Sequence, residues 1–379
     1  MISLRTKRLR EGMVTAQSIY NASGASYLTK GTPLNQQYID RLKHIGITQV
    51  AVTSADPDVQ LPPPEDIVQE QTRVTAIHRV FDTFKKPEDL EKNIEPLQAS
   101  AETIVLDLLD RHENLVQMTD IRLHDEYTFA HSVNVSILSS MLGLVCGLSR
   151  SELLTISLGG MLHDIGKIDV PGEVLNKPAP LSDEEFAMMR KHPEHGGRRI
   201  SKLMIPQAST LAAIAVQHHE HLDGKGYPRH LQDKQIKIYS RITEIADVYD
   251  ALTSDRVYKR AYKPHTAHKI MTKFSAGQFD LDLLTLFFQN VALYPIGTVL
   301  NTIFGYAVVK EVTPGQTHAP LVVLFADKQQ NLLETPRLVR LTDYPSNVIE
   351  SVLDDQELFT LTYRLKIDPS AFLTDEHIS

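Results

Sequence analysis

Histidine and aspartate gather in the middle of the chain in a pattern that suits metal chemistry. Eight of the 16 histidines fall between residues 131 and 230, where even spacing would place about four. The central pair is His163-Asp164, which follows an apolar segment. Imidazole suits Fe, Mn, Ni, Cu or Zn, and carboxylate can bridge two ions. The residues that we expect to join this pair are His131, His192, His218, His219 and Asp247.

Five histidines and two aspartates on separate predicted helices favour a site for two metal ions. Two ions about 3.5–4 Å apart lower the pKa of a bridging water and neutralise both oxygens of an in-line phosphoryl displacement. A lone histidine is more often an ordinary hydrogen-bonded side chain. The grouping, rather than any single residue, therefore indicates phosphoryl chemistry.

The same segments resemble the HD-GYP family of phosphodiesterases, which hydrolyse the bacterial second messenger cyclic di-GMP. The resemblance covers roughly residues 100–295, about half of the chain. It rests on YTFAHSVNV (127–135), HDIGK (163–167), KHPEHG (191–196), HHEHLDGKGYP (218–228) and ADVYDALTSDR (246–256).

This resemblance implies a role for each predicted metal ligand. His131, His163, Asp164 and Asp247 would bind one ion, with Asp164 as the bridge. The second ion would be completed by His192, His218 and His219. The expected cofactors are two divalent ions, iron or manganese first, with nickel, zinc and magnesium left open.

The family pattern also implies catalytic and substrate-binding residues. Lys167 would lie near the scissile phosphate as a charge stabiliser or proton donor, beside the catalytic pair His163 and Asp164. The residues expected to contact the substrate are Arg256, Lys259, Tyr227, Lys167 and Asp250.

Tyr127 marks a departure from some family members, which place a glutamate there, four residues before the first ligand histidine, to help bind a third metal. We therefore expect two ions and linear pGpG as the main product, with further cleavage to GMP left open. The alternative function is a catalytically weak cyclic di-GMP-binding adaptor that acts through protein partners. In the family the loop containing Gly226-Tyr227-Pro228 contacts partners such as diguanylate cyclases, and a homodimer is a further expectation.

The ligands require a helical scaffold. From Pro64 to about Tyr294 apolar residues recur at spacings of three and four, which predicts helices. Because neighbouring residues diverge by about 100° on a helix, His218 and His219 can reach one ion only near a helix end or a local distortion. The fold class expected is mainly α: an HD-type helical bundle holding a dinuclear metal site, between two small modules.

The predicted domain boundaries follow changes of pattern. Residues 1–62 read as a small α/β module with a helix at 36–44, and residues 63–100 as a linker and connecting helix. Residues 101–295 form the predicted catalytic domain. Residues 296–379 form a small β extension, with strands at 306–309, 321–325 and 338–341 and a loose tail after Pro369.

Composition agrees with a cytoplasmic enzyme. The 379 residues carry a formal net charge of -8, which argues against a general nucleic-acid partner. The single Cys146 cannot form an internal disulfide. Residues 132–149 are uncharged, but five serines and Asn134 favour a buried helix over a membrane span.

Overall fold

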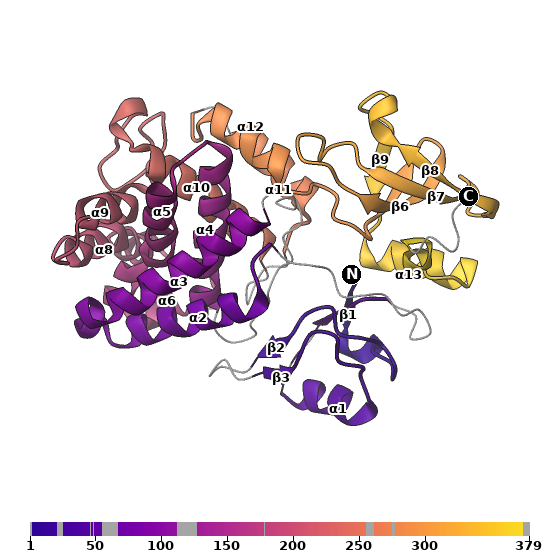
Figure 1. The fold of residues 1–379 in the computed structure, drawn as a ribbon, viewed down its shortest axis with the longest axis horizontal. Coiled ribbons are helices and arrows are strands. Elements are labelled where there is room, and N and C mark those ends of the chain that lie inside the picture. Colours follow the sequence, from indigo (N-terminus) through magenta and orange to yellow (C-terminus); the bar gives the residue numbers. More distant parts are fainter. Residues whose placement is uncertain are drawn as a thin grey trace. The chain divides into compact units, whose positions relative to one another are not determined.

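The computed structural model describes residues 2–20, 26–45, 47, 49–54, 67–111, 127–177, 179–254, 261–274 and 277–373. Within these ranges the chain forms two compact units. One is helical and contains the described residues of 67–290. The other contains residues from 2–54 and 291–373. Figure 1 shows the helical unit in purple to orange.

The helical unit is built from short and medium helices. Its α-helices are α2 (Glu70–Lys85), α3 (Leu90–Asp110), α4 (Tyr127–Val145), α5 (Arg150–Leu162), α6 (Gly172–Leu175), α7 (Asp183–Met189), α8 (His192–Ile200), α9 (Ala208–Gln217), α10 (Ile238–Thr253), α11 (Pro264–Phe274) and α12 (Leu281–Asn290). Its 3-10 helices are η2 (Pro87–Asp89), η4 (Ile165–Asp169) and η5 (Asp233–Gln235).

Helix α4 lies at the centre of this unit, in contact with α2, α3, α5, α10 and α12. Every residue from 130 to 143 is buried, serines included. A helix enclosed on all sides needs no charged face, which explains the uncharged stretch in the sequence. Across the described part of the chain, no helix combines the length and apolar character needed to cross a bilayer.

Small residues bring α5 close to α4. Helix α5 begins with a capping box, in which the Ser149 hydroxyl accepts from the Glu152 amide and the Glu152 carboxylate accepts from the Ser149 amide. Near its other end, a Cβ on Gly160 would lie 2.6 Å from Ser136 Cα, so only glycine allows this approach. Helix α5 therefore ends beside α4 and delivers His163 there.

A second close contact joins the segment after α5 to α8. A Cβ on Gly166 would lie 2.0 Å from the His192 carbonyl oxygen. Arg199 donates from Nε and Nη2 to the two oxygens of Asp169, at 3.0 and 2.5 Å. This bidentate pair ties η4 to α8. The segments that carry Asp164 and His192 are thereby held together.

The other unit contains the amino- and carboxy-terminal parts of the described chain. Antiparallel pairs form between β1 (Ile2–Arg5) and β4 (Gln49–Val52) and between β2 (Ile19–Tyr20) and β3 (Ser26–Leu28). Also present are η1 (Thr6–Arg8) and α1 (Gln36–His44), and the helix bounds match the prediction.

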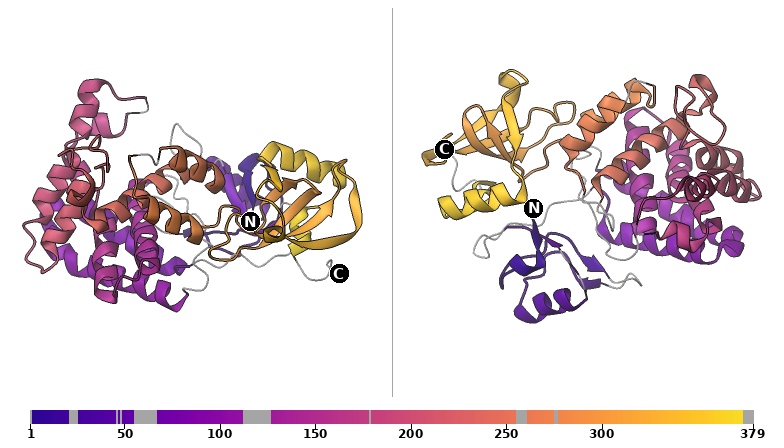
Figure 2. Two further views of the ribbon diagram at one scale, coloured as in Figure 1. Left: turned by 90° about the horizontal axis from the view of Figure 1, so that it is seen from above. Right: turned by 180° about the vertical axis from the view of Figure 1, so that it is seen from behind.

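An antiparallel sheet in the order β8-β7-β6-β5-β9 follows α12 in the chain. Its elements are β5 (Val299–Thr302), β6 (Gly305–Glu311), β7 (Leu321–Ala326), β8 (Leu332–Arg340), η6 (Leu341–Asp343) and β9 (Ile349–Val352), followed by α13 (Asp355–Leu365) and η7 (Pro369–Leu373). Leu361 and Phe372 pack against Val308 and Phe325, and Figure 2 shows the yellow helix beside the sheet.

These elements confirm the predicted fold class of a helical domain followed by a small β module. The three predicted strands lie in β6, β7 and β8, although Leu341 belongs to η6. The expectation of a loose tail after Pro369 is wrong for residues 370–373, because η7 buries Phe372 against the sheet.

Candidate metal centre

All seven predicted metal ligands come together in the helical unit, from five separate places in the chain. His131 lies on α4, and His163 and Asp164 directly follow α5. His192 begins α8, His218 and His219 follow α9, and Asp247 lies on α10. Six of the seven are buried, and the His219 side chain is 24% exposed. The predicted helix end at the histidine doublet is confirmed, since α9 ends at Gln217.

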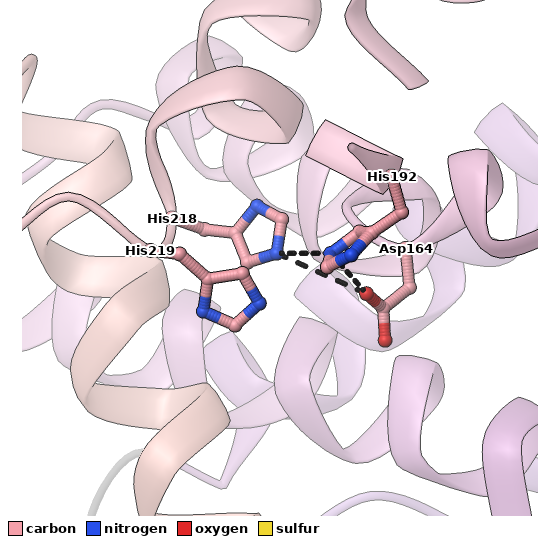
Figure 3. Close-up of side chains that lie close together, drawn as sticks. All are labelled: Asp164, His192, His218 and His219. Carbon is pink, nitrogen blue, oxygen red and sulfur yellow. Dashed lines mark hydrogen bonds and ion pairs between the residues drawn. The ribbon is translucent and has the colours of Figure 1, made fainter. Parts of the chain in front are cut away.

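Asp164 lies between two groups of histidines. Its Oδ2 is 3.2 Å from His163 Nε2 and 3.8 Å from His131 Nε2. Its Oδ1 is 3.2 Å from His192 Nε2 and 3.8 Å from His218 Nε2 (Figure 3). The two oxygens of one carboxylate thus face different histidines, as a bridging ligand requires.

Asp247 closes the other side of the cluster. Its Oδ1 is 3.1 Å from His131 Nε2, and its Oδ2 is 3.9 Å from His219 Nδ1. Among the described residues, donor atoms close enough to share an ion form three overlapping groups. They are Asp164 with His192, His218 and His219; His131 with His163 and Asp164; and His163 with His218 and Asp247.

Three histidine rings are oriented by backbone carbonyls. The Nδ1 of His163 donates to the Gly160 carbonyl at 2.7 Å, that of His192 to Met189 at 2.8 Å, and that of His218 to Ala215 at 2.9 Å. Such bonds fix the tautomer in which Nε2 carries a lone pair. Each of these rings therefore presents a metal-binding atom to the cluster.

His131 is oriented differently, by a carboxylate. Its Nδ1 donates to Asp250 Oδ2 at 2.6 Å, and Asp250 Oδ1 accepts from the Asn134 amide at 2.9 Å and the Ser254 hydroxyl at 3.2 Å. Asp250 is buried, and both of its oxygens are engaged within the protein. This geometry fits a residue that orients a ligand histidine. The substrate contact expected of Asp250 remains a prediction.

Burial and charge give the ligands contrasting proton affinities. Burial lowers the pKa of His218 well below its usual range, and the neighbouring imidazoles of His219 and His163 lower it further. Burial likewise lowers the pKa of His219 to about 3. For His131 the effect of burial is outweighed by hydrogen bonds to Asp247 and Asp250, which raise the pKa to about 9.

Asp164 stays ionised despite complete burial. Burial by itself disfavours the charged form, but electrostatic interaction with His163 and Lys167 holds the pKa of Asp164 well below its usual value. Lys167 Nζ, on η4, lies 2.5 Å from Asp164 Oδ2. The lysine predicted to act in catalysis therefore lies at the edge of the cluster.

The donor set fits divalent metal ions. Within the described residues, His163 Nε2 and Asp164 Oδ1 are buried atoms without a hydrogen-bond partner. Leaving such atoms unsatisfied costs free energy that coordination would recover. Imidazole nitrogens and ionised carboxylates are the ligands that borderline divalent ions prefer. The cluster can therefore hold metal.

The loop after the histidine doublet is tied to the cluster. Tyr227 stacks on His219, with ring centroids 4.7 Å apart and planes at 29°. Glu220 is fully buried and accepts from the Arg229 and Leu231 amides at 2.6 and 2.9 Å. A Cβ on Gly226 would lie 2.3 Å from the His221 nitrogen, so the loop requires glycine there.

Some residues of interest fall outside this picture. Arg256 and Lys259, expected to contact substrate, lie outside the described residues, as does the side chain of Tyr127.

Sequence reasoning missed two residues that the geometry makes prominent. Glu220 directly follows the doublet, and Asn134 lies three residues after His131. In both cases nearness to a predicted ligand was the available signal.

Comparison with known proteins agrees with the predicted resemblance. A family model described as an HD domain matches residues 105–283. A cyclic di-GMP phosphodiesterase of Pseudomonas aeruginosa is 39% identical over 193 residues, which are 50% of this chain and 46% of that protein. One from Thermotoga maritima is 32% identical over 200 residues, 53% of each protein. The chain thus spans about half the length of these relatives.

Two further similarities concern substrate and fold. A 3′3′-cGAMP-specific phosphodiesterase of Vibrio cholerae is 32% identical over 189 residues, 49% of this chain and 36% of that protein. The solved structure of an HD-GYP-type protein from Bdellovibrio bacteriovorus superposes with a TM-score of 0.50 at 20% identity. The match covers 75% of this chain and 96% of that one. These findings confirm the resemblance and the helical HD fold.

Proposed function

We propose that this chain, whose residues 105–283 belong to the HD-domain family, is a metal-dependent phosphodiesterase that hydrolyses cyclic di-GMP to linear pGpG. The observation that carries the proposal is the position of Asp164, with one oxygen toward His131 and His163 and the other toward His192 and His218. That arrangement suits two ions sharing a carboxylate. The names of the similar proteins support the choice of a cyclic dinucleotide as substrate.

The proposed metal ligands divide at Asp164. His131, His163, Asp164 and Asp247 would hold one ion. Asp164 would also bind the second, with His192, His218 and His219. Iron or manganese fits this mixed set best, with nickel, zinc and magnesium as alternatives. When bound, such a pair of ions activates water and neutralises charge on the phosphoryl group.

Other residues of the chain orient a proposed metal ligand and stabilise negative charge on the substrate. Asp250 keeps the His131 ring turned so that Nε2 faces the cluster. Lys167 places a positive charge beside Asp164, where it can stabilise negative charge on a bound phosphate or donate a proton to the leaving oxygen. Arg256, Lys259 and Tyr227 remain the residues that we propose to contact the substrate.

The wider assignments rest on the same resemblance. We assign catalysis to residues 101–295 and regulation, dimerisation or partner docking to residues 1–62 and 296–379, joined by the segment 63–100. Because the proposed substrate is a bacterial second messenger, we place the chain in the cytoplasm. Diguanylate cyclases are the partner class proposed for the loop at 226–228.

Hydrolysis of cyclic di-GMP by the full chain tests the function directly. Protein loaded anaerobically with Mn or Fe should convert the substrate to pGpG, with GMP appearing later or not at all. A parallel reaction with 3′3′-cGAMP measures substrate choice. Metal-loaded protein that binds cyclic di-GMP without cleaving it would favour the rival function, an adaptor that acts through protein partners.

A further inference from the structure

Arg190 is a cation beside the metal cluster that the proposed mechanism does not use. It directly follows α7, two residues before His192. Its guanidinium carbon lies 4.9 Å from the ring centroid of Tyr227 and 5.8 Å from that of Phe186. The Tyr227 ring in turn stacks on His219. Two ring contacts therefore connect this guanidinium to a proposed metal ligand.

The aromatic rings hold the guanidinium without using its hydrogen bonds. In the part of the chain that the structure describes, the Arg190 side chain contacts these two rings and has no ion pair or hydrogen bond. Contact with an aromatic face uses the flat side of guanidinium, whereas its five N–H donors point outward in the plane. The donors are thus oriented and free, and such a fork matches phosphate oxygens.

The position of Arg190 is accessible from solvent. Arg190 is partly exposed, and the Phe186 side chain beside it is 46% exposed although it is large and apolar. The Tyr227 ring contacts both His219 and Arg190, so it supports the guanidinium beside the cluster. The chain's formal charge of -8 means that an anionic substrate depends on local cations such as this one.

We propose that Arg190 is a substrate-binding residue that holds the second, non-scissile phosphodiester of a cyclic dinucleotide while the first lies at the metal cluster. The proposal rests on the proposed function. A cyclic dinucleotide carries two phosphodiesters, so one anionic group must lie away from the reacting one. Arg190 supplies a bidentate donor on the side of the cluster formed by His219 and Tyr227.

The test compares Arg190→Met with the wild type on two substrates. Met keeps an unbranched apolar stem but removes the charge and the donors. Loss of a hydrogen bond to a charged group should raise KM for cyclic di-GMP by about 10-fold or more, with kcat changed less. Bis(p-nitrophenyl) phosphate has a single phosphodiester, so its hydrolysis should be unchanged. Arg190→Lys keeps the charge but not the planar pair of donors. Its KM for cyclic di-GMP should lie between those of the wild type and Arg190→Met.

Arg198→Met serves as the matched control, because Arg198 is an exposed arginine on α8 that we place in no site. An unchanged KM for cyclic di-GMP in Arg190→Met would overturn the proposal. So would an equal loss of kcat on both substrates, which would make Arg190 a positioning residue acting through Tyr227 and His219. Wild-type protein that cleaves the small diester but no cyclic dinucleotide would instead overturn the proposed function, on which this inference rests.

Discussion

The two halves of the proposed metal centre are built on different principles. On one side, His192 and His218 are oriented by backbone carbonyls. On the other side, His163 is also oriented by a backbone carbonyl, but His131 is held between the carboxylates of Asp247 and Asp250. A carbonyl fixes a ring without adding net charge, whereas carboxylates raise its affinity for protons as well as for metal ions. The halves should therefore differ in metal affinity and in its dependence on pH, although Asp164 and Asp247 each face histidines of both.

Asp164→Ala should have the largest effect, because its two oxygens each lie 3.2 Å from a histidine of a different half, whereas those of Asp247 lie 3.1 Å from His131 but 3.9 Å from His219. We expect metal content near zero and a loss of hydrolysis greater than about 100-fold. That is the upper end of the loss typical when a residue that only orients a metal ligand is replaced. Elemental analysis and initial rates measure both. Glu173→Ala, an exposed acid on α6, is the control. A variant with full metal content and near wild-type turnover would exclude the bridging role.

Asp250→Asn should damage one half only. The amide can still accept from His131 Nδ1, but it carries no charge, so affinity for the ion at His131 should fall about 10–100-fold. The ion at His192, His218 and His219 should stay bound. Titration with a chelator, followed by elemental analysis, separates the two. Asn134→Ala removes only a partner of Asp250 and should cost less, and equal weakening of both ions would contradict the division into halves.

The pKa of His131 is raised and those of His218 and His219 are lowered, which predicts that metal affinity in the two halves depends on pH differently. Since His131 has a pKa of about 9, an ion there must displace a proton below that pH, and its affinity should rise with pH by up to about tenfold per unit before levelling off near pH 9. His218 and His219, with lowered pKa values, are already neutral at pH 6 and contribute no such slope. Chelator competition at pH 6, 7 and 8 measures both responses.

Asp250→Asn should also flatten the pH response at His131, because the carboxylate that helps to raise its pKa is gone. The same steep slope for both ions in the wild type would show that the contrast between carbonyl and carboxylate support does not govern metal binding.

The sequence was sufficient to predict which residues gather in the cluster but not how each is held. The spacing around His163-Asp164 and the doublet at 218–219 indicated the cluster, because residue type alone restricts which side chains bind such ions. Asp250 lies three residues after Asp247 on α10, so a shared helix face was predictable. That His131 lies between the two carboxylates depends on how α4 packs against α10, which are far apart in the chain. Local pattern carries no information on that packing.

Arg190 illustrates the same limit. In the sequence it is one of several basic residues around α7 and α8, and nothing distinguishes it from Arg198. Only the folded loop brings Tyr227 against it and leaves its donors free. The loop at 223–231 takes its shape from buried Glu220 and from a glycine contact, both tertiary features.

The smallest expected effect that tests the comparison of the two halves concerns the number of ions bound per chain. Helix α4 begins at Tyr127, one turn before His131, so residue 127 lies on the same helix face as His131. We expect two ions per chain in the wild type. A third divalent ion would suffer repulsion from the other two, which only added anionic ligands can offset, and tyrosine with an unperturbed pKa of about 10 is neutral at pH 7. Anomalous scattering on Mn- or Fe-saturated protein counts the ions, and three full sites in the wild type would defeat this reasoning.

Tyr127→Glu adds the missing carboxylate and should admit a third, weaker ion next to His131 without changing the ion at His192. Tyr127→Gln, similar in size but uncharged, should remain at two ions and so separates charge from shape.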